Sequence, residues 1–414
     1  MVASISEALD IIYKNVTPLT TEIVPVELAL GRVMAEDATA TFDLPRFDNS
    51  AMDGYAVKYN DANTTVVCNE VIYAGDNPTM TLEPKTAIKI MTGAPIPKGC
   101  EAIVPIEHVN VEGNLISLPS FELHAHIRRA GEDVKSGTIY LEKGERVTAY
   151  SIALLVSQGV THLTVYRKVK VAVFGTGDEL RPHFEKIKPH QLYNSNTPMF
   201  LSRASELGCD IRYIPSSGDT IESLEHTITS ALDADIIITS GGVSVGDKDF
   251  TKEAFSNLGM KTYFSKIDIK PGKPTGFGKI GNTTVINLPG NPLASMVNYE
   301  IFIRAVIRKL SGVNTFYHGI IETEIKEDFR LRKGKYTVKL GSFNGKSFMP
   351  LEAQLPGMVS PMQKADGMII IPPDVDSLQK GTKVKMLPIL WELTSKVEED
   401  LLSEINQKDN IEYV

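Results

Sequence analysis

Residues 235–252, DIIITSGGVSVGDKDFTK, decide the fold of a large part of this chain. The apolar run 236–239 predicts a buried strand, which leads directly into the glycine-containing turn 240–242. Glycines at such a turn can direct consecutive backbone N–H groups toward one anion. Asp247 and Asp249 follow, and carboxylates are the ligands that a hard cation prefers. The stretch therefore predicts a strand, a glycine loop and the start of a helix that together form a ligand site.

Strand and helix patterns alternate on both sides of this stretch, between residues 167 and 313. Such alternation predicts βαβ units and an α/β domain with a doubly wound, mostly parallel sheet. Acidic residues follow three successive predicted strands: Glu179 the first, Asp219 the second, and Asp247 with Asp249 the third. Because ligands of open α/β sheets bind at the carboxyl ends of the strands, we expect these acids to belong to one site.

Two proline-containing loops add to this predicted site. The sequence KPGKP presents Lys270 and Lys273 from a stiff backbone, which suits the binding of an oxyanion. The sequence LPGNP ends a strand and begins a helix, with Asn291 as N-cap and Pro292 at the first helical position, so N–H groups stay free. Ordinary turn chemistry explains the second loop equally well, and both interpretations of it stay open.

The composition of the 414 residues is ordinary for a soluble globular protein, with 42% hydrophobic and 23% charged residues. A net charge of −8 argues against nucleic acid or an anionic membrane surface as the main partner. The three cysteines lie far apart, without the spacing of a disulfide framework or of a thiolate zinc site. The sequence shows neither a signal peptide nor a run of about 18 apolar residues. We therefore expect a cytoplasmic protein.

The patterns divide the chain into four expected domains. Residues 41–133 contain short strands and turns, which predict a small all-β insertion. The insertion interrupts an N-terminal helical domain formed by residues 1–40 and 134–166. Residues 314–395 return to β character and predict a small barrel or sandwich. The α/β domain at 167–313 completes the set.

The segment 42–57, FDLPRFDNSAMDGYAV, is too polar and too interrupted by proline and glycine for a helix interior. Its acids, asparagine, serine and arginine fit a cation or phosphate site. Turn capping in a long connection explains the same residues, and it is the simpler interpretation of the composition alone.

Seven motifs, in order and over nearly the whole chain, resemble those of the molybdopterin molybdenumtransferase family, which includes MoeA and the gephyrin E domain. They are PRFDNSAMDGYAV, MTGAPIP, RRAGED, TGDEL, SGGVSVGDKDFTK, IKPGKP and LPGNP. The resemblance implies an elongated homodimer of four-domain subunits whose third domain is similar to molybdopterin adenylyltransferase. It also implies a Mg²⁺-dependent reaction in which molybdate and adenylyl-molybdopterin give molybdenum cofactor and AMP. Transient partners would be the adenylyltransferase and molybdoenzymes.

The resemblance also assigns roles to residues of this chain. The expected catalytic residues are Asp53, Thr92, Asp133, Glu179, Asp219 and Asp249, of which Glu179, Asp219 and Asp249 are expected to hold the metal. The expected ligand-binding residues are Gly175, Thr176, Gly177, Ser240, Gly241, Gly242, Ser244, Lys270, Lys273, Pro289, Pro292 and Ser360. The two lysines among them would form the molybdate pocket.

The last domain departs from the family pattern. Where the family has Gly-Arg, an aromatic residue and a second Arg, this chain has Gly334-Lys335-Tyr336 and then Lys339, and a common Ser-Ser pair reads Ser360-Pro361. Lysine keeps the positive charge but lacks the bidentate fork of arginine. We therefore expect a looser oxyanion pocket, or one tuned to another metal oxyanion such as tungstate.

Two other function classes compete with this interpretation. The run 242–246, GVSVG, matches the G-x-S-x-G elbow of serine hydrolases, which would make Ser244 a nucleophile. The triad histidine would then have to be His318, far downstream, and the extra Gly241 and the trailing acids do not fit an elbow. A gephyrin-like scaffold is the non-enzymatic alternative, and the lack of a fused adenylyltransferase domain or long linker argues against it.

Overall fold

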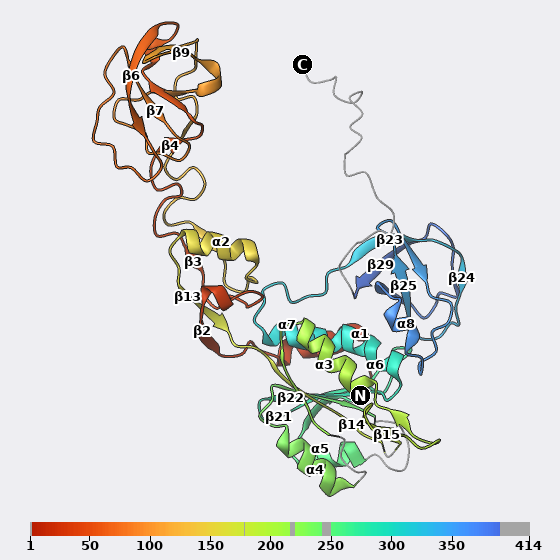
Figure 1. The fold of residues 1–414 in the computed structure, drawn as a ribbon. Coiled ribbons are helices and arrows are strands. Elements are labelled where there is room, and N and C mark those ends of the chain that lie inside the picture. The colour runs from red at the N-terminus through yellow and green to blue at the C-terminus, as the bar shows by residue number, and fades with distance from the viewer. Residues whose placement is uncertain (1, 178, 216–219, 242–249, 390–414) are drawn as a thin grey trace. The chain divides into compact units, whose positions relative to one another are not determined.

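The computed structural model describes residues 2–177, 179–215, 220–241 and 250–389. They form two compact units, which are described separately (Figure 1). Unit 1 contains residues 1–20 and 166–414, and unit 2 contains residues 21–165. Several residues with expected roles lie outside the described residues. They are Asp219, Gly242, Ser244, Asp247 and Asp249.

A six-stranded sheet forms the centre of unit 1, in the order β17-β14-β18-β22-β21-β19. The bounds are β14 (Lys170–Gly175), β17 (Asp210–Tyr213), β18 (Ile236–Ser240), β19 (Lys261–Phe264), β21 (Gly276–Ile280) and β22 (Thr283–Leu288). The first four strands of that order pair in parallel, whereas β21 runs antiparallel to both β22 and β19. This is the mostly parallel sheet that the alternating pattern predicts.

Helices cover both faces of this sheet (Figure 1). They are α3 (Asn196–Glu206), α4 (Ile221–Ser230), α5 (Phe250–Asn257), α6 (Pro292–Asn298), the π-helical turn η4 (Tyr299–Ile303) and α7 (Arg304–Leu310). Successive residues of a strand point to opposite faces. Accordingly Val171 and Val173 pack in the cluster that contains α3 and α6, whereas Ala172 and Phe174 pack with α4 and α5. The sheet is therefore buried on both sides, as predicted.

The N-terminal helix α1 (Ile5–Asn15) also belongs to unit 1. Its capping box forms as the sequence predicts: Ser4 accepts a hydrogen bond from the Glu7 N–H, and the Glu7 carboxylate accepts one from the Ser4 N–H. Ala8 and Ile12 are buried in the core of the α/β domain. Residues 1–20 therefore pack with that domain instead of with residues 21–40. Periodicity identifies the apolar face of a helix but not the core against which it packs.

Unit 2 contains a second six-stranded sheet, in the order β8-β5-β7-β6-β10-β9. The bounds are β5 (Gly54–Val57), β6 (Thr65–Ile72), β7 (Thr86–Ile90), β8 (Ala102–Pro105), β9 (Asn110–Glu112) and β10 (Leu115–Ser117). All six strands fall inside the predicted all-β insertion. The rest of unit 2 includes β2 (Thr21–Pro25), η1 (Val26–Leu28), α2 (Ala149–Ser157) and β13 (His162–Tyr166). The finer division into four domains stays a prediction.

The C-terminal part of unit 1 is a closed barrel, which decides between the barrel and the sandwich that the sequence left open. Its strands are β23 (Ile321–Ile325), β25 (Thr337–Phe343), β26 (Ser347–Pro350), β27 (Gly367–Ile371) and β29 (Lys383–Pro388). The barrel is joined to the α/β domain at Lys270, whose N–H donates to Tyr336 O and whose carbonyl accepts from the Val338 N–H, each at 2.8 Å.

None of the helices in the described part of the chain is long and apolar enough to cross a membrane.

Candidate functional site

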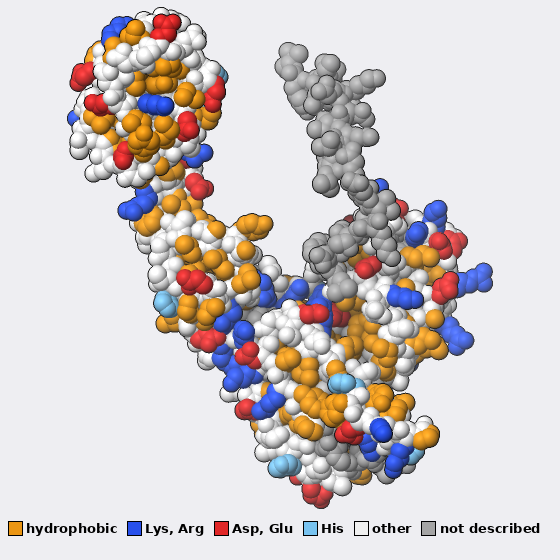
Figure 2. All heavy atoms as spheres, viewed as in Figure 1, with side chains coloured by type: hydrophobic (Ala, Val, Ile, Leu, Met, Phe, Trp, Pro, Cys, Tyr) orange, Lys and Arg blue, Asp and Glu red, His pale blue; other side chains and the backbone are white. Residues whose placement is uncertain are grey.

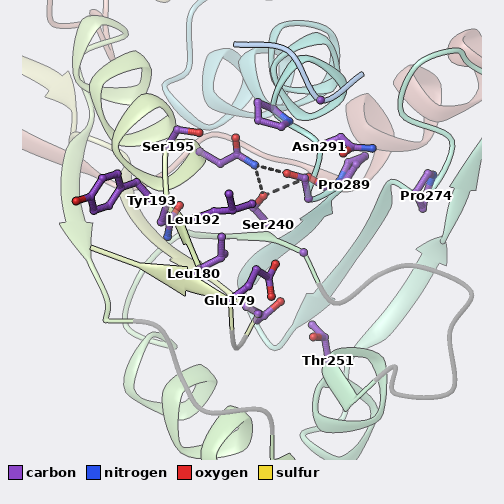
Figure 3. Close-up of a pocket in the computed structure, with 18 of the residues that line it drawn as sticks. Glu179, Leu180, Leu192, Tyr193, Ser195, Ser240, Thr251, Pro274, Pro289 and Asn291 are labelled. Atoms are coloured by element: carbon purple, nitrogen blue, oxygen red, sulfur yellow. Dashed lines mark hydrogen bonds between the residues drawn. The ribbon is translucent and has the colours of Figure 1, made fainter. Parts of the chain in front are cut away.

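A cavity of about 830 Å³ opens at the carboxyl ends of β14, β18 and β22, as Figure 3 shows. It will be called the large cavity. Seven of the residues with expected catalytic or ligand-binding roles line it: Thr176, Gly177, Glu179, Ser240, Gly241, Pro289 and Pro292. Three separate loops supply these residues, so the fold brings together strand ends that are far apart in the sequence. Their part in binding a ligand stays a prediction.

Two glycines let the loops of the large cavity approach each other closely. Gly241 has a φ of +96°, and a Cβ at this position would lie 2.5 Å from the carbonyl oxygen of Thr176. A Cβ on Gly175 would lie 2.7 Å from Nδ2 of Asn194. Larger residues would therefore push the ends of β14 and β18 away from their neighbours. Gly175 supports the wall of the cavity in this way without lining it.

A hydrogen-bond network fixes the polar floor of the large cavity. The side-chain amide of Asn196 donates to the hydroxyl of Ser240 and to the carbonyl of Gly290, both at 2.8 Å, and Ser240 donates to Pro289 O at 3.2 Å. Both amide hydrogens of Asn196 are thus used, which leaves Oδ1 as an acceptor. Within the described structure neither this oxygen nor Oγ1 of Thr176 has a hydrogen-bond partner. Buried polar atoms without partners are uncommon and often belong to ligand sites.

Glu179 supplies a carboxylate to the wall of the large cavity (Figure 3). It lies against Gly177, where a Cβ would come within 2.8 Å of both carboxylate oxygens. A carboxylate in a cavity suits Mg²⁺, which keeps several waters and takes few protein carboxylates. The residues that the structure describes contain no group of three His, Cys, Asp or Glu side chains that could hold a metal. The other two expected metal ligands, Asp219 and Asp249, lie outside those residues.

A second cavity, of about 390 Å³, lies where the loop that contains Lys270 meets the barrel. It will be called the cationic cavity, because Lys270, Arg330, Arg332 and Lys339 line it and no Asp or Glu does so among the described residues. Burial, with a smaller contribution from the charge of Lys270, lowers the pKa of Lys339. Converging cations without an acidic partner suit the binding of an oxyanion.

The five-residue loop 270–274 reaches both cavities. Lys270 lines the cationic cavity, and Pro274 lines the large cavity. Lys273, the second lysine of the expected molybdate pocket, is exposed and lines neither of them. Ser360 is also exposed, at the start of α8 (Ser360–Gln363), and its neighbour Val359 lines the large cavity in its place.

Three further expected site residues belong to unit 2. The backbone N–H and the hydroxyl of Thr92 both donate to Oδ1 of Asp53, at 2.7 and 2.8 Å. These hydrogen bonds, the backbone one first, lower the pKa of Asp53. Asp133 is exposed, and its N–H donates to Leu44 O at 3.0 Å. The structure thus pairs Asp53 with Thr92, as one polar cluster of unit 2.

Several polar residues of the two cavities were not predicted from the sequence. The run 194–196, Asn-Ser-Asn, lines the large cavity and precedes the apolar face of α3. Polar residues before a helix are a usual sign of a helix start, and this sign was present in the sequence. Arg330 and Arg332 carried no such signal, because arginines near a short strand are usually exposed to solvent; both are exposed here and also line the cationic cavity.

The structure removes the support for a serine hydrolase that uses His318. Nε2 of this histidine donates to Ile301 O at 2.6 Å, and Nδ1 lies 3.4 Å from Nη2 of Arg304. Burial lowers the pKa of His318 to about 4. His318 is therefore a neutral, half-buried residue that does not line the large cavity. Its supposed partner Ser244 lies outside the described residues.

Models of three protein regions match the chain in succession. The MoeA N-terminal region (domain I and II) matches residues 3–159, a probable molybdopterin binding domain matches residues 172–309, and the MoeA C-terminal region (domain IV) matches residues 326–389. The matched segments follow the order of the expected domains and cover most of the chain.

Individual proteins resemble the chain over most of its length. Molybdopterin molybdenumtransferase 2 of Mycobacterium tuberculosis is 33% identical over 387 residues, which are 90% of this chain and 95% of that protein. Molybdopterin molybdenumtransferase of Haemophilus influenzae is 38% identical over 301 residues, which are 71% of this chain and 74% of that protein. The crystal structure of a molybdopterin biosynthesis MoeA protein from Pyrococcus horikosii is 28% identical, has a TM-score of 0.81, and covers 94% of this chain and 99% of its own.

Proposed function

The chain belongs to the MoeA family of molybdopterin molybdenumtransferases, which insert molybdenum during molybdenum cofactor biosynthesis, and from this premise we propose that its two cavities hold the two substrates. Adenylyl-molybdopterin binds in the large cavity, and molybdate binds in the cationic cavity. Insertion of the metal is coupled to the release of AMP and requires Mg²⁺. Tungstate is the alternative oxyanion, since the two are nearly isosteric.

One observation carries this proposal: the loop 270–274 belongs to both cavities. Its first residue, Lys270, is held to the barrel through Tyr336 and Val338, so the loop has little freedom to move. An oxyanion at Lys270 and a pterin at Pro274 would therefore be presented to each other by one rigid segment. Holding two reactants in a reactive arrangement lowers the entropic part of the barrier.

In this reaction the main task of the protein is to hold two anions close together, and proton transfer by side chains is less important. Molybdate exchanges one oxygen ligand for the two dithiolene sulfurs of the pterin, and this oxygen leaves as water with the two thiol protons. A water molecule adds to the phosphoanhydride, and AMP is the leaving group. Lys270 and Lys339 balance the charge of the oxyanion, while the acceptor atoms of Asn196 and Thr176 meet donors of the adenylyl-pterin. Glu179, with Asp219 and Asp249, would hold Mg²⁺, and a bound Mg²⁺ supplies positive charge to the phosphates.

The proposal is tested by AMP release from adenylyl-molybdopterin, with and without molybdate and with and without Mg²⁺. Wild-type protein is expected to release AMP only when both are present. Glu179→Gln is expected to lose most of this activity, since it removes a cavity carboxylate. Glu185→Gln is the matched control, because Glu185 is exposed and does not line the cavity. AMP release at the same rate with and without molybdate would overturn the proposal. AMP release with tungstate but not with molybdate would mean that tungstate is the substrate, with the same mechanism.

A homodimer is the second part of the proposal. The surface of unit 2 carries exposed hydrophobic side chains over α2, as Figure 2 shows. Tyr150 of α2 is 88% exposed and Leu28 of η1 is 72% exposed, and these two elements contact each other. Neighbouring apolar side chains in solvent indicate an interaction surface, here for a second copy of the chain.

Light scattering at several concentrations tests this association. Wild-type protein is expected to have the mass of a dimer, and Tyr150→Asp is expected to have that of a monomer. Tyr73→Asp is the control, since Tyr73 is also exposed but lies in the inserted sheet region. A monomeric wild type would refute the dimer. Contacts with the adenylyltransferase and with molybdoenzymes stay predictions.

A further inference from the structure

We propose that Arg330 and Arg332 select dianionic oxyanions for the cationic cavity and draw them in from solution. This inference rests on the proposed function, in which the cationic cavity holds molybdate. It adds a role for two residues that neither the motifs nor the departures of the last domain indicated.

The two arginines reach the cavity from a different part of the barrel than the lysines. Lys270 comes from the loop 270–274 and Lys339 from β25, whereas Arg330 ends the short strand β24 (Phe329–Arg330) and Arg332 follows it. Strand β24 pairs with β28 (Ser377–Leu378), and the N–H of Leu331 donates to Asp376 O at 2.7 Å. The backbone that carries both arginines is therefore anchored.

Neither arginine is neutralised by an acid. Among the described residues, no hydrogen bond or ion pair is formed by the guanidinium of Arg330 or of Arg332. The adjacent Lys333 behaves differently: it does not line the cavity, and its ammonium lies 3.1 Å from a carboxylate oxygen of Asp376. Asp376 thus pairs with Lys333, which does not line the cavity, and not with either cavity arginine.

Four cations line one cavity and repel each other, and the charge of Lys270 contributes, after burial, to the lowered pKa of Lys339. An anion relieves the repulsion, and a dianion relieves more of it than a monoanion does. Arginine adds geometry, because its planar fork binds two oxygens in parallel, whereas lysine acts as a point charge. The arginines therefore favour a tetrahedral dianion such as molybdate over a monoanion of the same shape, such as perrhenate.

Calorimetric titration with molybdate and with perrhenate tests the inference without any turnover. Arg330→Gln and Arg332→Gln are each expected to weaken molybdate binding by about tenfold, as for a charge-assisted hydrogen bond, and to weaken perrhenate binding much less. Each variant is also expected to show a weaker dependence of molybdate affinity on salt concentration. Arg330→Lys and Arg332→Lys, which keep the charge without the fork, are expected to recover part of the affinity.

Lys333→Gln is the matched control, since it removes the same charge from the next residue and is expected to leave binding within about twofold of the wild type. Arginine variants that bind molybdate with the wild-type affinity would overturn the inference. So would variants whose affinities for molybdate and for perrhenate fall by the same factor. In that case molybdate-dependent AMP release by the wild type would leave the proposed function intact. Conversely, selective dianion binding through the arginines together with molybdate-independent AMP release would overturn the proposed function alone.

Discussion

The side-chain amide of Asn196 lies 2.8 Å from the hydroxyl of Ser240 and ties the first turn of α3 to the end of β18. The same amide donates to Gly290 O, so a single side chain connects loops that follow two different strands. The positions of three walls of the large cavity are therefore coupled through one buried residue.

Replacing this asparagine is expected to weaken binding of the adenylyl-pterin. Asn196→Ala removes two buried hydrogen bonds and the unpartnered acceptor Oδ1, so we expect KM for adenylyl-molybdopterin to rise by about tenfold or more. Steady-state AMP release measures KM and kcat together. Asn257→Ala is the control, because Asn257 makes an exposed hydrogen bond to Glu225 on α4. An unchanged KM in Asn196→Ala would show that the network does not serve the substrate.

Glu300 holds two arginines in the interior of unit 1. It is 1% exposed, and it accepts from Arg203 at 2.7 Å and from Arg304 at 2.9 Å. The two arginines also donate to Ile389 O and Pro388 O at the end of β29, which fastens the barrel to the α/β domain. The cationic cavity, formed by residues of both, depends on this attachment.

Glu300→Gln is expected to destabilise the protein by about 3–5 kcal/mol, because it leaves buried cations without their counterion. Glu206→Gln removes the exposed partner of Arg203 and is expected to cost less than about 1 kcal/mol. Chemical denaturation of the two variants, followed by circular dichroism, gives both values. Equal losses of folding stability in the two variants would contradict the prediction that the buried ion pairs of Glu300 contribute more than the exposed pair of Glu206.

His318 is expected to make stability depend on pH. Burial lowers the pKa of His318 to about 4, below the ordinary value of 6.5. Between these two pH values the unfolded chain binds a proton at His318 and the folded protein does not. The neutral His318 therefore contributes its full share of the folding stability above the unfolded pKa. This contribution, up to about 3 kcal/mol for a shift of this size, is lost as pH falls toward the folded pKa. Denaturation midpoints across this range are expected to fall less steeply in His318→Gln than in the wild type. His226→Gln, at an exposed histidine, is expected to keep the wild-type slope.

Lys339 is expected to set the pH dependence of oxyanion binding. Its pKa is lowered by burial and, to a smaller extent, by Lys270. Because a dianion binds the protonated form, affinity is highest below this pKa and falls as pH rises through it. Molybdate titrations from about pH 7 to about pH 10 are expected to show the fall at a lower pH than an ordinary lysine gives. Lys339→Arg is expected to abolish this early fall in affinity, because arginine stays protonated over the whole range. Lys335→Arg is the control and is expected to keep the fall, because Lys335 does not line the cavity.

Local signals predicted much of the fold correctly. The capping box of Ser4 and Glu7 marked the start of α1. Gly159, with a φ of +73°, lies shortly after the end of α2, where glycine commonly follows a helix. Strand β21 was missed, because its sequence GFGKI contains two glycines, which are unusual inside strands. Gly278 is needed there, since a Cβ would lie 2.7 Å from Lys261 O on the neighbouring strand.

Contacts between residues far apart in the sequence could not be predicted from local sequence patterns. The strand-end rule placed Glu179 at the ligand-binding edge of the sheet, and Glu179 lines the large cavity. Nothing in the sequence indicates that Lys270 lines the cationic cavity while Lys273 lines neither cavity, because this depends on the pairing of Lys270 with β25. The arginines of the cationic cavity were missed for the same reason.

Anomalous diffraction from a crystal soaked with tungstate and adenylyl-molybdopterin tests the central claim, that one loop joins two substrate cavities, most directly. The account predicts a tungsten peak in contact with Lys270 and Lys339, and pterin density in the large cavity beside Pro274 and Asn291. A tungsten peak at the exposed Lys273, or pterin density away from the ends of β14, β18 and β22, would contradict it.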